Sequence, residues 1–307
     1  MTKVIKNLRR LAAIATIAGL GVGINGGAQA IVVTEEGVAA TLATAILGIG
    51  AGVTVTGSSL SGHGGGGSLS SGTYSNASGT YGIGDGVMLS SGAVVDYGDG
   101  PNTSPSFTTS YGVAATAPQE VLLDNITGGA LTHYDATELT LTFDVDALTT
   151  EIFFNVVWGS DEYPEFVDTI FIDAFGIYLN GTGIGDNIAF FGGAPVNVDH
   201  PDMIAIPGVT TELDGVLDPT GLSGDPIMLF TASVTPGSIG NTLTFIIADS
   251  GDSAYDSTVY ISGFGSEDPG GGTPGGGGVV PEPASMTLFG LGLLGLGVAR
   301  RRSRRKA

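Results

Sequence analysis

The sequence has no cysteine among its 307 residues, and it places no Lys or Arg between residues 31 and 299. The first absence excludes a disulfide framework and thiol catalysis. The second leaves all 30 acids in a body without a Lys or Arg partner. Each Asp or Glu there must be hydrated, hydrogen-bonded, protonated or neutralised by a bound cation. Such a body is also a poor partner for nucleic acid and anionic lipid.

Several catalytic patterns are missing as well. No G-x-S-x-G motif lies between strand and helix patterns, which argues against a serine hydrolase. His63, His133 and His200 are not clustered, which disfavours a zinc site. The glycine clusters lack the Lys-Ser/Thr of a phosphate loop. A glycosidase that uses paired carboxylates is the enzymatic alternative that stays open, although aromatic residues that bind sugars are sparse.

Residues 1–30 have the parts of a secretory signal peptide. A basic start is followed by an apolar region from Leu11 to Ile24. Ala28 and Ala30 then fit the small-x-small rule for cleavage by signal peptidase. The sequence therefore predicts export of the residues that follow, in a manner that suits a Gram-negative bacterium.

The C-terminal end combines a linker, a short motif and an apolar segment. Residues 266–280 are rich in Gly and Pro and are expected to be a disordered linker. Pro281, Glu282 and Pro283 follow, and residues 281–307 then continue with an apolar helix and an arginine cluster. An apolar helix over 284–299 spans about 24 Å, which is short of a bilayer core of about 30 Å. With its arginines cytoplasmic, it predicts transient anchoring in the inner membrane.

The body, residues 31–265, is predicted to be mainly β. Thr34 to Leu47 predicts one N-terminal helix, the only substantial helix expected there, and residues 57–80 predict a flexible loop rich in Gly and Ser. Leu139 to Asp146 alternates as a half-buried strand. Further short apolar runs, separated by turn signals, favour an antiparallel β-sandwich of jelly-roll-like type over βαβ units.

Carboxylates gather in the central part of this body. The run from Ile152 to Trp158 reads as a strand buried on both faces, and a second strand contains Phe175, Ile177 and Leu179. The connecting loop holds four acids within residues 161–168, and a late loop holds two more. Because Ca²⁺ takes six to eight oxygen ligands in irregular loops, these acids predict a calcium site. The predicted metal ligands are Asp161, Glu162, Asp168, Asp173, Asp252 and Asp256. The alternative is that they only cap turns and accept backbone N–H bonds.

Two stretches resemble known families. Pro281-Glu282-Pro283, the segment MTLFGLGLLGLG and the arginine cluster resemble a PEP-CTERM sorting signal. The body resembles the choice-of-anchor L domain through residues 160–166, 173–176, 86–92, 100–102 and 248–257. The first resemblance implies recognition and removal by an exosortase, followed by display on the cell surface or in the extracellular polysaccharide matrix.

These observations predict an exported, non-enzymatic protein of the cell surface or extracellular matrix. The expected domain is stabilised by calcium and serves binding or adhesion, with extracellular polysaccharide as a partner. A carbohydrate-binding module without a metal is the alternative.

Overall fold

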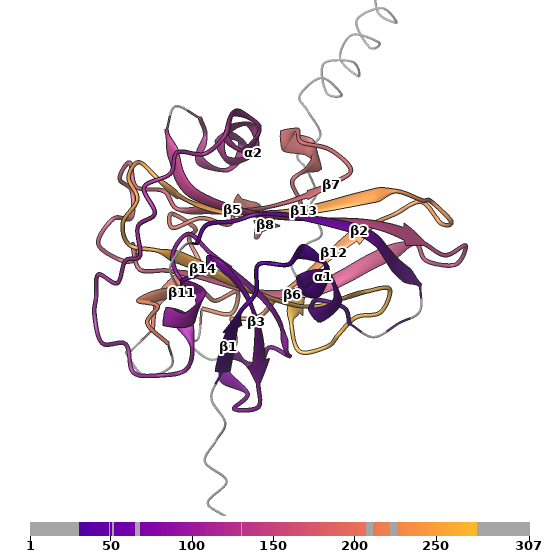
Figure 1. Cartoon of the computed structure of the whole chain (residues 1–307), viewed down its shortest axis with the longest axis horizontal. Coiled ribbons are helices and arrows are strands. Elements are labelled where there is room, and N and C mark those ends of the chain that lie inside the picture. The colour runs from indigo at the N-terminus through magenta and orange to yellow at the C-terminus, as the bar shows by residue number, and fades with distance from the viewer. Residues whose placement is uncertain are drawn as a thin grey trace, which may run out of the picture.

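The computed structural model describes residues 31–274, apart from Ile49, Ala51, 65–67, Ala130, 207–210 and 222–225. Figure 1 shows two stacked β-sheets with one helix lying on the outer face of the upper sheet. The predicted mainly β, antiparallel sandwich is therefore confirmed. The predicted signal peptide and sorting segment fall outside the described residues.

Within the described residues, the larger sheet has nine strands. Its main path runs β1-β3-β4-β14-β6-β11-β10, and β12 pairs with β6 and with β15. The strands are β1 (Ile31–Glu35), β3 (Ser71–Asn76), β4 (Gly86–Ser90), β6 (Glu151–Ser160), β10 (Met203–Ala205), β11 (Gly215–Leu217), β12 (Met228–Ser233), β14 (Ser257–Gly265) and β15 (Thr273–Pro274).

The smaller sheet has four strands in the order β2-β5-β13-β7, again within the described residues. They are β2 (Val53–Ser61), β5 (His133–Val145), β7 (Ala174–Leu179) and β13 (Asn241–Ser250). A separate hairpin joins β8 (Phe190–Phe191) to β9 (Ala194–Pro195). The helical elements are α1 (Ala39–Ala45), α2 (Ala117–Thr127) and the 3-10 turns η1 (Thr80–Gly82), η2 (Val94–Tyr97) and η3 (Ile184–Asp186).

The core lies between the two sheets. The predicted alternation of β5 is confirmed, because Leu139, Leu141 and Phe143 are buried in this core while the residues between them are half-buried. Phe154 of β6 packs against Phe245 of the smaller sheet, with ring centroids 5.6 Å apart. The described clusters take all their members from residues 31–264, so residues 31–274 carry their own core.

Strand β6 is buried on both faces, as its apolar run predicts. Phe154, Val156 and Trp158 face the core between the sheets. Val157 faces the other way, into a second cluster that contains Tyr97 and Tyr260. A central strand covered on both sides needs apolar residues at successive positions, which explains the continuous run.

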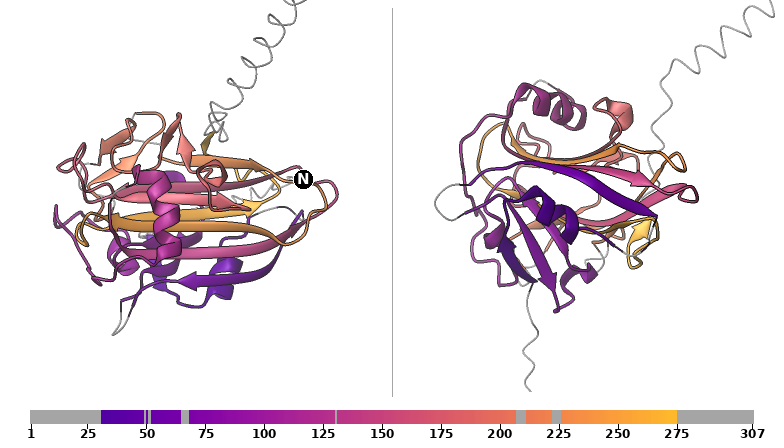
Figure 2. Two further views of the ribbon diagram at one scale, coloured as in Figure 1. Left: turned by 90° about the horizontal axis from the view of Figure 1, so that it is seen from above. Right: turned by 45° about the vertical axis from the view of Figure 1, so that its right-hand side comes forward.

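Helix α2 covers the outer face of the smaller sheet, as both views of Figure 2 show. Leu122, Leu123 and Ile126 pack there against Tyr178 and Ile246. Gly176 permits this close approach, because a Cβ at that position would lie 2.7 Å from Ile126 Cδ1. The sequence pattern did not predict this helix, and the expectation of a single substantial helix is wrong.

Two local predictions are corrected. Residues 31–35 form strand β1, paired with β3, so the helix expected from Thr34 begins only at Ala39. The Gly- and Ser-rich stretch 57–80 contains most of β2 and all of β3 instead of a flexible loop. Small residues are tolerated there because β2 is an edge strand held by its ladder with β5.

The end of the described chain differs from the composition-based linker. β15 pairs in parallel with β12, and Asn155 Nδ2 donates to the Gly270 carbonyl over 2.8 Å. Thr273 and Pro274 therefore add a short strand to the larger sheet. None of the helices in the described part of the chain is both long and apolar enough to span a bilayer.

Candidate functional site

Four strand ends from both sheets meet at one end of the sandwich. In the larger sheet Ser160, the last residue of β6, pairs with Ser257, the first residue of β14. In the smaller sheet Ala174, the first residue of β7, pairs with Ala248 near the end of β13. The loops that carry the predicted ligands, 161–173 and 251–256, therefore leave the fold at the same end.

These registers place acids opposite one another. Asp161 follows Ser160 and Asp256 precedes Ser257, and the Asp161 N–H donates to the Asp256 carbonyl over 3.1 Å. Asp249 follows Ala248 and Asp173 precedes Ala174; after burial, the charge of Asp173 is the largest cause of the raised pKa of Asp249. Like charges at opposing positions repel each other, so each sheet ends in an acidic pair that needs compensation.

The acids at this end are buried. We call Asp161, Glu162, Asp173, Asp249 and Asp256 the buried acid cluster, since each is at most 1% exposed. No Lys or Arg occurs between residues 31 and 299 to neutralise them. Ionised carboxylates are rarely buried without a cationic partner or a metal, so this cluster is the main electrostatic anomaly of the described fold.

Two members of the cluster have both carboxylate oxygens hydrogen-bonded. Asp161 accepts the Tyr97 hydroxyl at 3.0 Å and the Asp214 N–H at 3.1 Å. Asp173 accepts the Ser250 N–H at 3.0 Å and the Ser257 hydroxyl at 2.8 Å, which links a strand of each sheet. Asp161 and Asp173 therefore have structural partners whether or not a metal binds.

The other three members have oxygens without a hydrogen-bond partner. Both carboxylate oxygens of Asp249, Glu162 Oε2 and Asp256 Oδ1 are buried and unpaired, and so is the nearby Ser250 hydroxyl. The Ser91 hydroxyl lies near Asp249, but it donates to the Ser257 carbonyl at 3.4 Å. Each unpaired buried polar group costs about 1–3 kcal/mol, and a charged one costs more.

Burial is the main cause of raised pKa values throughout the cluster. It raises the pKa of Asp161 to about 9. Burial and the charges of Asp173 and Asp252 raise the pKa of Glu162 to about 10. Burial raises the pKa of Asp256 to about 7, and it raises those of Asp173 and Asp249 well above the ordinary range. Near neutral pH these carboxyls favour a proton, or a cation in its place.

The structure separates the six predicted ligands. Glu162, Asp173 and Asp256 lie in the cluster, as does Asp161 with its two hydrogen bonds. Asp252 is half-buried at the margin and its Oδ1 accepts the Ala254 N–H at 3.1 Å. Asp168 is exposed, and no structural feature joins it to the buried acid cluster; its N–H donates to Asp199 Oδ1 at 2.6 Å.

Asp249 is not among the ligands predicted from the sequence. A signal was present, because Asp249 directly follows the apolar run from Phe245 to Ala248 at the end of β13. An acid that continues a buried strand is unusual and can be detected from sequence. Asp135 is also buried, but its carboxylate accepts the N–H groups of Tyr111, Gly112 and Val113, which accounts for both its oxygens.

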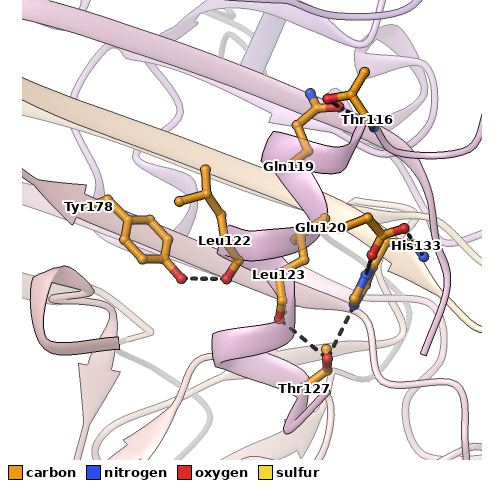
Figure 3. A network of polar contacts seen from close by, with 8 residues as sticks. All are labelled: Thr116, Gln119, Glu120, Leu122, Leu123, Thr127, His133 and Tyr178. Carbon is orange, nitrogen blue, oxygen red and sulfur yellow. Dashed lines mark hydrogen bonds and ion pairs between the residues drawn. The ribbon is translucent and has the colours of Figure 1, made fainter. Parts of the chain in front are cut away.

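A different trio has the most compact arrangement of ligand atoms. Glu120, Asp124 and His133 each offer one oxygen or nitrogen atom that could bind a metal. Among the described residues, this is the group of His, Asp and Glu side chains whose three ligand atoms lie within 4.8 Å of one another. Figure 3 shows His133 between Glu120 and Thr127 of α2. Its Nδ1 lies 2.5 Å from Glu120 Oε2 and its Nε2 lies 3.2 Å from the Thr127 hydroxyl. Both ring nitrogens thus have protein partners, and the contact fastens α2 to β5.

Comparison with known protein families gives two matches. The choice-of-anchor L domain matches residues 32–266, and the PEP-CTERM protein-sorting motif matches residues 279–305. Both resemblances read from the sequence are confirmed, and the second match includes Pro281, Glu282 and Pro283. No curated protein matches the chain.

Proposed function

Since the chain belongs to the choice-of-anchor L domain family and carries a PEP-CTERM sorting motif, we propose that it is an exported adhesion protein stabilised by calcium. The motif implies export, a surface or extracellular location, and processing by an exosortase. In our proposal the host is a Gram-negative bacterium. Signal peptidase cuts after Ala30, and the apolar segment 284–299 anchors the chain in the inner membrane until the exosortase acts.

The observation that carries the calcium proposal is the buried acid cluster in a body without Lys or Arg. Its donors are oxygens, the class of ligand that Ca²⁺ prefers. Calcium sites of extracellular modules typically have dissociation constants of about 10⁻⁴–10⁻³ M, which suits an exported domain. A cation at this end would compensate the opposed acids of both sheets and so hold the sandwich together.

A non-enzymatic role agrees with the burial of these carboxylates. A glycosidase needs two carboxyl groups that face a bound sugar. The members of the buried acid cluster are at most 1% exposed and so do not face a substrate. In our proposal, a bound cation makes them a stabilising part of the domain.

One observation favours the alternative of a carbohydrate-binding module without a metal. Phe166, Phe171 and Tyr255 are half-buried, and Phe166 lies 5.4 Å from Phe171 and 5.1 Å from Tyr255, measured between ring centroids. Aromatic rings with one free face suit the apolar faces of sugars. The two loops that carry these rings also carry the acids, so a calcium-stabilised domain can use the same rings to bind extracellular polysaccharide.

Thermal unfolding of residues 31–274 tests the calcium proposal. The melting temperature is measured in EDTA and in millimolar calcium, with magnesium and concentrated NaCl as controls. A site that binds only the folded chain adds about 2.7 kcal/mol of stability at 100 times its Kd. An increase specific to calcium supports the proposal. An equal increase with every salt would mean only screening of like charges and would refute it.

A further inference from the structure

We infer that the calcium ion binds within the buried acid cluster with Asp249 as an indispensable ligand, beside Glu162, Asp173 and Asp256, and without Asp168. This inference rests on the proposed function and identifies the residues of its metal site. It adds a ligand that the sequence pattern did not indicate, and it removes one that the pattern favoured.

Asp249 has no Lys or Arg partner in this part of the chain. Its side chain is fully buried at the end of β13, and both its carboxylate oxygens lack a hydrogen bond. Asp173 across the strand pair and Asp256 at the start of β14 are the first neighbours whose charges raise its pKa. A buried carboxylate whose charged neighbours are all acids, with the Ser91 hydroxyl nearby, needs a cation or a proton.

Several oxygens of the buried acid cluster are free to bind an ion. Glu162 follows β6, Asp256 precedes β14 and Asp249 ends β13, so three strand ends supply unpaired carboxylate oxygens. The Ser250 hydroxyl is also buried and unpaired, and the Ser250 N–H donates to Asp173 Oδ1 at 3.0 Å. These oxygens approach the six to eight that calcium takes, with water completing the shell.

The chemistry of the donors selects the ion. The buried acid cluster contains no His, and the chain contains no Cys, which makes it a poor site for zinc or copper. Magnesium demands near-ideal octahedral geometry and keeps several waters, which an irregular buried cluster does not favour. Calcium accepts irregular oxygen cages and so is the divalent cation that this cluster suits.

The cluster must rearrange to hold the ion. Within the described residues, its carboxylates do not bring three ligand atoms within 4.8 Å of one another. Gly92 marks where the packing is tightest, since a Cβ there would lie 1.7 Å from Asp256 Oδ2. Binding therefore requires the side chains around Asp256 and Asp249 to rotate. Tyr97, whose hydroxyl donates to Asp161, should show this rearrangement as a change in the near-ultraviolet circular dichroism spectrum.

The test is calorimetric titration of calcium into residues 31–274, comparing wild type with Asp249→Asn and with Asp168→Asn as the matched control. We expect one calcium per chain for the wild type and for Asp168→Asn. Asp249→Asn should weaken binding by more than the roughly 10–100-fold that loss of an outer-shell partner costs. In EDTA it should unfold at the wild-type temperature or above, because it removes a buried acid with no partner.

The outcomes separate this inference from the proposed function. If wild type binds calcium and Asp249→Asn binds it equally well, the ligand assignment is wrong while the calcium proposal stands. If Asp168→Asn loses binding, the assignment also fails. If wild type binds no calcium, both fail. Should Asp249→Asn not fold, Glu162→Gln decides, since wild-type affinity in that variant would overturn the inference.

Discussion

The metal-free domain should lose stability as the pH rises, which is the reverse of ordinary acid denaturation. The perturbation is a change from about pH 5 to about pH 8 in EDTA. Burial raises the pKa of Asp256 from 3.8 to about 7 and that of Asp161 from 3.8 to about 9. Between the unfolded and folded pKa values, the folded chain binds more protons than the unfolded chain, so stability falls with rising pH.

The magnitude follows from these two residues. One pKa unit corresponds to about 1.4 kcal/mol, so the full shift of Asp256 amounts to about 4 kcal/mol. This stability is complete below the unfolded pKa near 3.8, decreases through the window above it, and is lost once the pH exceeds about 7. Asp161 extends the same loss towards about pH 9. A loss of several kcal/mol is large against the roughly 5–15 kcal/mol that stabilises a domain.

The assay is urea unfolding of residues 31–274, followed by the fluorescence of Trp158, at several pH values with and without calcium. Trp158 is fully buried, so its emission reports unfolding. In EDTA the free energy of unfolding should fall between about pH 5 and about pH 8. Calcium should restore it mainly at the upper end, because its ligands must be deprotonated. A free energy in EDTA that is constant or rises over this range would refute the reasoning.

Three further predictions concern packing around the site and the core. Phe154→Ala should cost about 3–5 kcal/mol in urea unfolding, because Phe154 packs against Phe230 and Phe245 between the sheets; a cost below 1 kcal/mol would contradict this position in the core. Gly92→Ala should lower calcium affinity in calorimetry, because its Cβ would displace Asp256, and unchanged affinity would argue against Asp256 as a ligand. Thr116→Ala should destabilise the fold by about 1 kcal/mol in thermal unfolding, because the Thr116 hydroxyl, like its backbone N–H, donates to Gln119 Oε1 at the start of α2. Thr116→Ser, which keeps the hydroxyl, is the control and should be unchanged.

Local patterns predicted much of the fold correctly. The alternation of β5 and the continuous apolar run of β6 both follow from which faces of a strand are covered, and this leaves a direct trace in composition. Strands with weak patterns were missed. Thr34 and Glu35 of β1 were assigned to the predicted helix, but pairing with β3 outweighs that local preference. Helix α2 was missed because its apolar face is narrow, with Leu122, Leu123 and Ile126 as its contacts.

The sequence by itself indicated that this protein is exported to the surface or the extracellular space. It also indicated that its acidic side chains need a partner other than Lys or Arg. The sorting motif is a linear signal, and the absence of Lys and Arg between residues 31 and 299 is a matter of composition. Only the tertiary structure decided which acids share one site. It brought Asp249 close to Asp173 and Asp256 close to Asp161, and it left Asp168 exposed in the same loop as Asp161. The reason is that strand register and burial are set by pairing between distant segments, which spacing along the chain does not encode.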